Sequence, residues 1–308
     1  MQNCQDVVEI QPVTNVAGEY SGETVFLLAP GPSLQYVDFE QLENKTTFAF
    51  NHAHLLYDQT AWRPTFFLQN HDVRRANIRE GLKKSLKGDA ICFINPQKSA
   101  GELPKDLNGE IYDIETRGNR RPESTSDAAR VAARYWNVDC PEDGFYSFAS
   151  TLGLAAQLCG ALGFNEIVLV GADLYRPFPI KTRLIEYGDD PGTWRIRINQ
   201  EHPFDISPFI EYIQQSRAPI ASSVNLVYYM LLYKILNILP TRDLNHLHPE
   251  YSNNSGLDYQ SRNRLYRLEY AAVQEGCNQS GIDLWDASLI NRLDMIPRYD
   301  NKWELYDC

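Results

Sequence analysis

The stretch STLGLAAQLCGALGFNEIVLVGADLY, residues 150–175, decides the fold class of this 308-residue chain. It begins with a serine suited to cap a helix, continues through small and apolar residues, and reaches a glycine stop at Gly163. The apolar run at 166–171 then predicts a buried strand. A helix followed directly by such a strand is typical of the units that build a parallel sheet.

Short apolar runs elsewhere alternate with helical patterns in the same way. Before this unit we expect five strands, at residues 24–29, 47–51, 65–70, 91–95 and 110–114. The pattern resumes with an amphipathic helix at 259–276 and a strand at 282–288. We therefore expect an α/β fold with a Rossmann-like, mostly parallel sheet flanked by helices. Residues 1–175 and 257–308 would form this domain, and residues 176–256 an inserted helical lid over the carboxyl ends of the strands.

Composition narrows the functional class. The net charge is −11 and the pI is about 5.1, which argues against general binding to nucleic acid because phosphate contacts need a basic footprint. The six cysteines form no CxxC pair, so neither a zinc site nor a disulfide framework is expected. The N-terminus does not resemble a signal peptide, and we expect a cytoplasmic protein.

The stretch SSVNLVYYMLLYKILNILP, residues 222–240, predicts an apolar helix that ends at a proline. It is too short and too polar to span a bilayer comfortably. The favoured interpretation is a core helix or a subunit contact in a homo-oligomer. The alternative is a helix at 222–239 that rests on the inner membrane as a peripheral contact.

Polar residues follow several of the expected strands. The first strand ends in Ala-Pro-Gly-Pro-Ser at 29–33, the next two end at Asn51 and Asn70, and the strand at 166–171 is followed by Asp173. Because ligands bind beyond the carboxyl ends of parallel strands, we expect these residues to converge on one site. Gly31, held between two prolines, would leave bare backbone for a nucleotide. Gly31→Val should then abolish nucleotide binding and leave the fold intact.

The segments LLAPGPSLQYVDFEQL, FAFN, FFLQN and ALGFNEIVLVGADLY, in this order, resemble the bacterial sialyltransferases of glycosyltransferase family 42. They also resemble a wider group of surface-polysaccharide proteins with a GPSL turn and a pterin-pyrophosphokinase-like domain. The resemblance covers about half of the chain and implies a variant of the GT-A fold. It also implies a cytidine-monophosphate site formed by Gly31, Pro32, Ser33, Asn51, Asn70, Asp173 and Tyr175. The sequence departs from the family where Pro30 replaces an asparagine, and where Lys181 and Arg183 stand near the place of a second tyrosine.

The family mechanism implies inverting transfer of a sugar from a nucleotide-sugar, with a CMP-linked acidic sugar suspected, to a glycan or lipopolysaccharide acceptor. His246 or His248 would be the general base, with His202 as the runner-up, since histidine titrates near neutral pH. Tyr175, helped by Lys181 or Arg183, would stabilise the departing phosphate. No cofactor or metal beyond the donor is expected. The basic stretch at 117–130 is expected to be a solvated, mobile loop that leads into a helix capped near Ser126, although its arginines at 117, 120 and 121 are candidates to bind an acidic sugar.

Three alternatives stay open at this point. His52, His54, His71 and Asp72 follow adjacent strands and are candidates to bind a transition metal. A pterin-type diphosphokinase would use ATP and Mg²⁺, but the chain has few clustered carboxylates for it. A non-catalytic nucleotide-binding protein would function without the histidines of the lid.

Overall fold

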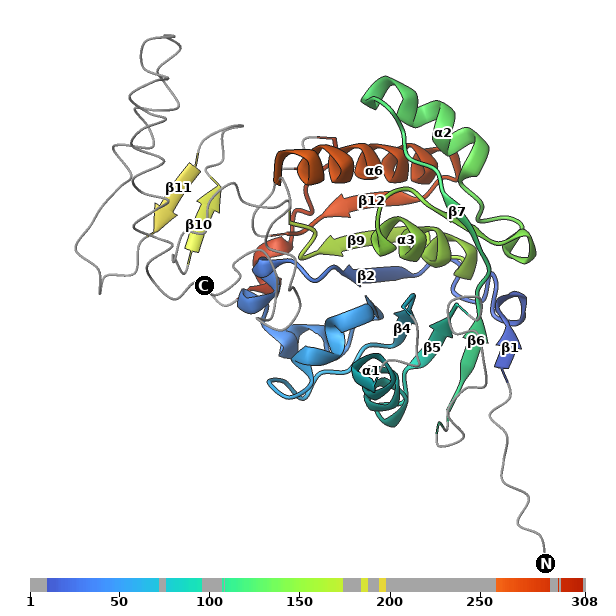
Figure 1. The fold of residues 1–308 in the computed structure, drawn as a ribbon. Coiled ribbons are helices and arrows are strands. Elements are labelled where there is room, and N and C mark those ends of the chain that lie inside the picture. Colours follow the sequence, from blue (N-terminus) through green and yellow to red (C-terminus); the bar gives the residue numbers. More distant parts are fainter. Residues whose placement is uncertain are drawn as a thin grey trace, which may run out of the picture.

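One parallel sheet of eight strands organises the part of the chain that the structure describes (Figure 1). The structure is a computed structural model, and it describes residues 10–71, 76–95, 107, 109–173, 184–187, 194–197, 259–288, 293 and 295–306. The strand order is β1-β6-β5-β4-β3-β2-β9-β12. Along the chain these strands are β1 (Ile10–Pro12), β2 (Thr24–Leu28), β3 (Thr47–Phe50), β4 (Phe66–Gln69), β5 (Ile91–Ile94), β6 (Ile111–Asp113), β9 (Glu166–Val170) and β12 (Asp283–Asp286).

The order of the strands reverses beside β2. From β2 to β6 each strand is added on one side of its predecessor, whereas β9 and then β12 are added on the other side of β2. All seven pairings are parallel, so the carboxyl ends of the strands share one edge. This arrangement confirms the expected α/β class. It also places a topological switch point, where ligands of such sheets bind, between β2 and β9.

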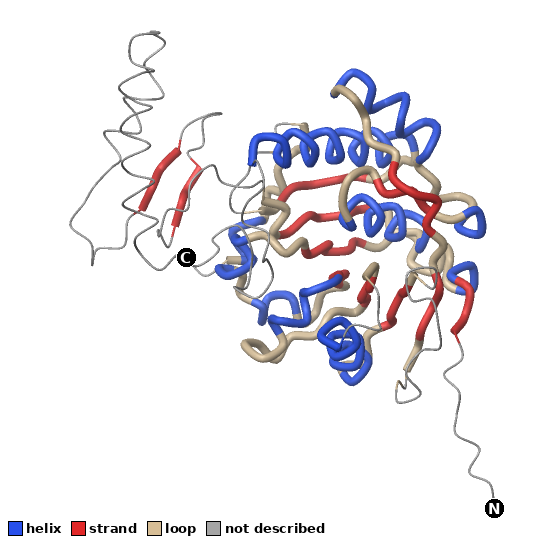
Figure 2. Tube along the Cα trace, viewed as in Figure 1, coloured by secondary structure: helices blue, strands red, loops and turns tan. Residues whose placement is uncertain are grey.

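Helices cover both faces of the sheet, as Figures 1 and 2 show. The helices α2 (Ala128–Tyr135), α3 (Thr151–Leu162) and α6 (Tyr259–Gln279) lie on one face, and α1 (Ala76–Lys87) lies on the other. Successive strand residues therefore enter two separate cores, with Leu27 in the core under α3 and α6 and Leu28 in the core under α1. Burial on both sides is the reason that the strands are continuous apolar runs rather than alternating ones.

The unit at 150–175 forms as its sequence predicts. The Ser150 side chain caps α3 by accepting a hydrogen bond from the Leu152 N–H (3.1 Å), and Gly163 ends the helix in a left-handed conformation at φ +101°. The last helix begins at Tyr259 as expected and runs three residues past the predicted end. The strand that follows it, β12, pairs with β9 and forms one edge of the sheet.

Three parts of the secondary structure differ from expectation or were missed. The basic stretch at 117–130 is not a loop throughout, because β7 (Thr116–Asn119) pairs with β8 (Phe145–Ser147) in a small parallel sheet. The helix after it begins at Ala128, following a 3₁₀ turn at Thr125–Asp127. Inside the expected lid, β10 (Leu184–Tyr187) and β11 (Trp194–Arg197) form an antiparallel pair; the remainder of 176–256, including the helix expected at 222–239, lies outside the described residues.

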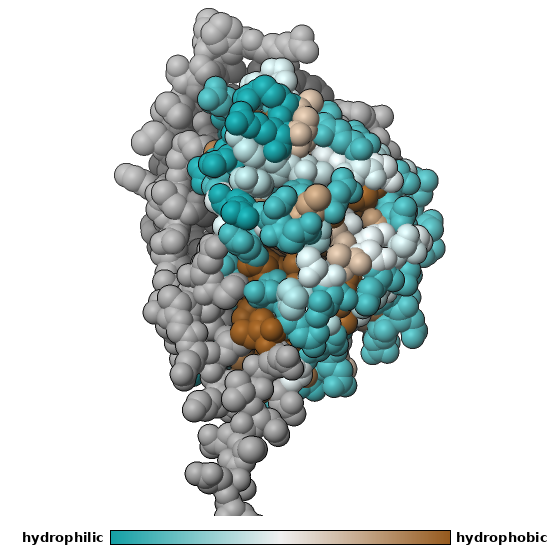
Figure 3. All heavy atoms as spheres, turned by 90° about the vertical axis from the view of Figure 1, so that its right-hand side faces the viewer, coloured by the Kyte–Doolittle hydropathy of each residue, from teal (hydrophilic) through white to brown (hydrophobic). Residues whose placement is uncertain are grey.

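On the face that Figure 3 shows, hydrophilic residues are the more numerous among the coloured atoms, and hydrophobic residues are visible between them. Ile10, at 37% exposure, is the exposed large hydrophobic residue found in the described ranges. In the same ranges, no helix combines the length and the apolar character needed to cross a bilayer.

Candidate functional site

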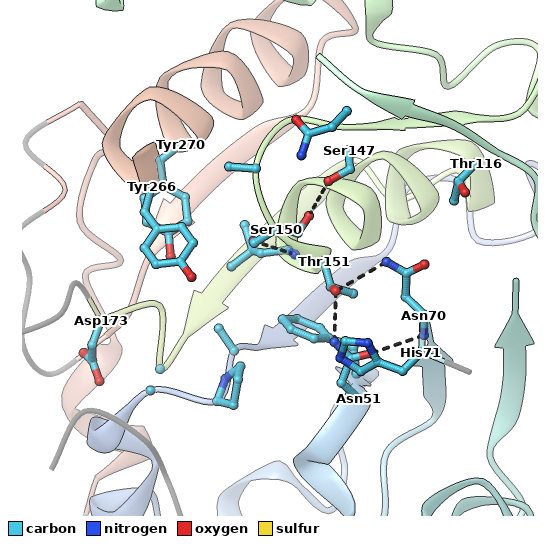
Figure 4. A pocket seen from close by; sticks show the side chains of 18 of the residues that line it. Asn51, Asn70, His71, Thr116, Ser147, Ser150, Thr151, Asp173, Tyr266 and Tyr270 are labelled. Carbon is cyan, nitrogen blue, oxygen red and sulfur yellow. Dashed lines mark hydrogen bonds between the residues drawn. The ribbon is translucent and has the colours of Figure 1, made fainter. Parts of the chain in front are cut away.

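A cavity of about 520 Å³ lies at the carboxyl ends of the strands, beside the switch point between β2 and β9. Its size falls within the range of roughly 300–1,000 Å³ that small-molecule sites occupy. Figure 4 shows Asp173, Tyr266 and Tyr270 on one side of it and Thr116 on the opposite side, with Thr151 between them. The walls therefore come from both halves of the sheet, from the first turn of α3, from the β7–β8 sheet and from α6.

The loops after β2 and β9 are bound to each other. The Gly31 N–H donates to the Gly171 carbonyl oxygen (3.0 Å), and the Ser33 N–H donates to Asp173 Oδ2 (2.6 Å). A Cβ on Gly31 would collide with the Gly171 carbonyl oxygen and would lie 2.7 Å from Asp173 Oδ2. This clash contradicts the expectation that Gly31→Val would leave the fold intact, and it explains the glycine without a nucleotide. The glycine is required because a neighbouring strand end occupies the space of its side chain, although its backbone still lines the cavity.

Five polar side chains form a continuous hydrogen-bonded row, which we call the amide–hydroxyl chain: Asn51, Thr151, Asn70, Asn95 and Thr116. Four of them line the cavity, and Asn95 is buried behind it. Asn51 Nδ2 donates to Thr151 Oγ1 (2.9 Å), and Asn70 Nδ2 approaches the same oxygen at 3.5 Å. Asn95 Nδ2 lies 3.4 Å from Asn70 Oδ1 and donates to Thr116 Oγ1 (2.7 Å). The amide–hydroxyl chain thus links the ends of β3, β4 and β5 to α3 and β7.

Thr151 is the member of the amide–hydroxyl chain that accepts from two asparagines. Its hydroxyl oxygen accepts hydrogen from two asparagine amides, so its own hydrogen is directed elsewhere. Thr151 lines the cavity at the start of α3, and only 8% of it is exposed. A ligand in the cavity would therefore meet a hydroxyl group that is held in orientation and able to donate.

Asn51 holds the corner where β3 ends. Its backbone is left-handed (φ +52°), a conformation that asparagine adopts more readily than most residues. Its Oδ1 accepts from the Asn70 N–H (3.2 Å), and its carbonyl oxygen lies 3.0 Å from His54 Nδ1. Burial lowers the pKa of His54, which favours the neutral ring with Nδ1–H donating to that carbonyl. Both polar atoms of the Asn51 side chain are thus used to orient Asn70 and Thr151.

A buried carboxylate fixes the segment that carries Thr151. Glu269 Oε1, on α6, accepts hydrogen bonds from the backbone N–H groups of Ser150 (2.7 Å), Ala149 (3.1 Å) and Gly153 (3.3 Å). Burial raises the pKa of Glu269, and these hydrogen bonds oppose the shift. Because Tyr266 and Tyr270 lie on the same helix and line the cavity, the Glu269 contact sets two of its walls at once.

A second buried carboxylate supports the loop that carries Asp173. Ser288 Oγ accepts from the Ala172 N–H (2.8 Å), and the Ser288 N–H donates to Asp286 Oδ1 (2.9 Å). Burial raises the pKa of Asp286 to about 7, with the charge of Asp173 acting in the same direction. The position of Asp173 therefore depends on contacts from the segments that follow β2 and β12.

The structure places part of the expected site. Four expected residues line the cavity: Gly31, Asn51, Asn70 and Asp173. Ser33 is buried beneath Asp173 and Pro32 begins the 3₁₀ helix after the Gly31 turn, so these two support the loop. The remaining expected residues lie outside the described ranges: Tyr175, Lys181, Arg183, His202, His246 and His248.

Other lining residues were missed from the sequence. They are Thr116, Asn119, Ser147, Ser150, Thr151, Tyr266 and Tyr270. Ser150 was interpreted only as a helix cap, and Thr151 next to it carried the signal of a polar side chain at a helix start facing the strand ends. The residues of β7 and β8 gave no comparable signal, because the sequence did not predict that sheet.

The histidines near the cavity do not form a metal centre with other ligands in the described part of the chain. The His52 ring lies 6.0 Å from that of His54 and 5.7 Å from that of His71, centroid to centroid. Asp72, the fourth candidate ligand, lies outside the described residues. Among the residues that are described, no group of three or more His, Cys, Asp or Glu side chains is arranged to hold a metal ion.

The arginines of the basic stretch do not line the cavity. Arg117 pairs with Glu115 (3.4 Å) and donates from Nε to the Asp143 carbonyl oxygen (2.5 Å). The Arg120 guanidinium lies over the rings of Tyr135 and Tyr146, 5.4 and 5.7 Å from their centroids. The suggestion that these two arginines bind an acidic sugar is therefore not supported by their positions.

Comparisons with known proteins add little to this geometry. No protein-family model matches the sequence, and no curated protein matches it either. Among solved structures, the chain is similar to the "Structure of MAf glycosyltransferase from Magnetospirillum magneticum AMB-1", with 18% identity and a TM-score of 0.31. The match covers 58% of this chain and 27% of that chain, so the matched part corresponds to about a quarter of that protein. A likeness at this level carries no argument about substrate or mechanism, and it does not show membership of family 42.

Proposed function

We propose that this protein is a glycosyltransferase that uses a nucleotide-activated sugar. The observation that carries the proposal is the amide–hydroxyl chain in a cavity at the switch point of a parallel sheet. Neutral amides and hydroxyls suit a ligand rich in hydroxyl groups, because groups that bond to one another still keep further donors and lone pairs for a ligand. The resemblance of the strand-end motifs to the sialyltransferases supports the same class.

In this proposal the nucleoside lies on the side of the cavity formed by Gly31, Asp173, Tyr266 and Tyr270. A carboxylate at the end of a strand accepts hydrogen bonds from ribose hydroxyls in other nucleotide-binding sheets, and Asp173 is held for that role by the Ser33 N–H. Tyr266 and Tyr270 lie on the same side of the cavity as Asp173 (Figure 4), and an aromatic ring there offers a stacking surface for the base. The Thr151 hydroxyl then donates to the part of the donor nearest α3.

The finer assignments rest on the resemblance and on residues outside the described ranges. In the narrowest form of the proposal, the donor would be a CMP-linked acidic sugar and the acceptor a glycan or glycolipid. The acceptor oxygen bonds to the anomeric carbon as the carbon–oxygen bond to the phosphate breaks. The nucleotide leaves with the electron pair, next to Tyr175 with Lys181 or Arg183, while the acceptor proton passes to His246 or His248.

The test is donor turnover by the full chain. The protein is incubated with CMP-N-acetylneuraminic acid and, separately, with UDP- and GDP-sugars, and release of the free nucleotide is measured by chromatography with and without EDTA. We expect release from one nucleotide class, insensitive to EDTA. Asn70→Ala should lower the release rate, whereas the matched control Asn278→Ala, in an exposed residue of α6, should not.

The histidines are tested in the same assay. Loss of turnover in His246→Ala or His248→Ala, with nucleotide binding retained, would support a base in the lid. Phosphoryl transfer from ATP that requires Mg²⁺, with no sugar-donor turnover, would overturn the proposal in favour of a diphosphokinase.

A further inference from the structure

The cavity continues past Asn70 towards the small β7–β8 sheet. We call this end, lined by Thr116, Gly118, Asn119 and Ser147, the β7–β8 arm. In Figure 4 Thr116 lies on the far side of the cavity from Asp173, with Thr151 and Asn70 between the two. A ligand whose nucleoside lies beside Asp173 would therefore direct its other end into this arm.

The polar atoms of the arm retain hydrogen-bonding capacity. Thr116 Oγ1 accepts from Asn95 Nδ2 (2.7 Å) and keeps its own hydrogen, whereas Ser147 Oγ donates to the Ser150 carbonyl oxygen (3.0 Å) and keeps its lone pairs. The Asn119 side chain is exposed, and it makes no hydrogen bond with the residues that the structure describes. Its amide adds two donors and an acceptor. The arm thus presents both donors and acceptors within one short strand pair.

The charged side chains of Arg117, in β7, and of Arg120, directly after it, are held outside the arm. Arg117 is bound to Glu115 and to the Asp143 carbonyl oxygen, and Arg120 lies over two tyrosine rings. The described lining of the arm is therefore uncharged. Such a surface suits hydroxyl groups, which need a donor and an acceptor each, better than a phosphate, which needs cations or several donors.

Gly118 leaves one wall of the arm as bare backbone. Its φ of +106° is a conformation that favours glycine, and no atom lies within 4 Å of the place where a Cβ would be. The space beside the Gly118 backbone is therefore open, and no side chain of the described residues fills this edge of the arm.

We propose that the β7–β8 arm binds the hydroxyl groups of the sugar that is transferred, and that Asn119 and Thr116 set the preference among donor sugars. This inference rests on the proposed function, because it assumes that a nucleotide occupies the Asp173 side. It assigns to β7 a role in recognising the sugar, separate from recognition of the nucleotide.

The test compares two ligands that differ only by the sugar. Dissociation constants of CMP and of CMP-N-acetylneuraminic acid are measured by titration calorimetry for the wild type, Asn119→Ala, Thr116→Val and Thr116→Ser, with Asn278→Ala as the exposed asparagine control. If the first panel selects another nucleotide, that nucleotide and its sugar conjugates replace the CMP pair. We expect Asn119→Ala to weaken binding of the sugar conjugate about 2- to 13-fold, the range for one hydrogen bond, and to leave binding of the bare nucleotide unchanged. Thr116→Val should do the same, and Thr116→Ser should restore wild-type binding.

The outcomes separate this inference from the proposed function. If no nucleotide binds to the wild type, the proposed function fails and the inference fails with it. If a nucleotide binds but the variants weaken nucleotide and conjugate equally, or weaken neither, the proposed function stands and the inference is overturned. A sugar conjugate that binds no better than its bare nucleotide would also overturn it.

Discussion

Replacing Thr151 by valine removes one hydroxyl group and keeps the shape of the side chain. In the folded protein that hydroxyl accepts the hydrogen bond from Asn51 Nδ2 at 2.9 Å, at a site where Asn51 is 4% and Thr151 8% exposed. Without it, a buried amide hydrogen has no acceptor, which costs about 1–3 kcal/mol. The longer contact from Asn70, at 3.5 Å, adds little to this value.

Thr151→Ser is the matched control, because serine keeps the hydroxyl and loses only a methyl group. Its cost should not exceed about 0.8 kcal/mol. The first assay is urea unfolding of both variants and the wild type at pH 7.5. The second is nucleotide binding without urea, under conditions in which all three proteins are folded. We expect Thr151→Val to be the less stable variant and to bind nucleotide about 2- to 13-fold more weakly, since it also loses the donor that faces the cavity. If Thr151→Val is as stable as Thr151→Ser and binds nucleotide equally well, the amide–hydroxyl chain does not have the role assigned to it.

Three further predictions concern the supports of the site. Gly31→Ala should lower the free energy of unfolding by about 1–3 kcal/mol, because its Cβ would push apart the loops that carry Gly171 and Asp173; wild-type stability in urea would contradict the packing described. The folded-state pKa of Asp286 is raised to about 7, so its contribution to stability is full below the unfolded value near 3.8 and is lost as the pH rises through 7. Relative to the wild type, Asp286→Asn should therefore gain stability between pH 5 and pH 8.5, by at most about 3 kcal/mol, and a constant difference across that range would argue against a buried acid. The pKa of His54 is lowered, so its contribution to the free energy of unfolding is present above pH 6.5 and is lost as the pH falls below that value. Between pH 7.5 and pH 5.0, urea unfolding should show that the wild type loses more stability than His54→Gln. Equal losses in the two proteins would contradict the lowered pKa.

The sheet could be predicted because its strands carry a strong local signal. The eight-stranded sheet is buried on both faces, so six of the predicted strands stand out as apolar runs, and β12 follows a helix with a clear pattern. The strands that were missed are short or weakly apolar. β7 reads Thr-Arg-Gly-Asn, and nothing in that composition predicts that it pairs with β8, in which Phe145, the partner of Thr116, lies 29 residues further along the chain.

The residues of the candidate site that could be predicted are those that follow the ends of strands. Asn51 and Asn70 follow strands directly, Asp173 comes shortly after β9, and the parallel topology brings all three to one edge. What the sequence could not provide was the reason for Gly31, because its neighbour Gly171 is 140 residues away along the chain and becomes adjacent only through the β2–β9 pairing. The same holds for Glu269, whose contact with the start of α3 joins two helices more than 100 residues apart.

The central claim is that the cavity at the β2–β9 switch point binds the nucleotide of a sugar donor. The most direct measurement is a thermal-shift panel of CMP, CDP, UDP, GDP and ATP, each with and without Mg²⁺, on the wild type and on Thr151→Val. A ligand that binds only the folded state raises the unfolding temperature by mass action. The account predicts stabilisation by CMP or CDP without metal, and a smaller shift in Thr151→Val. Stabilisation by ATP only in the presence of Mg²⁺, or a shift that Thr151→Val leaves unchanged, would contradict it.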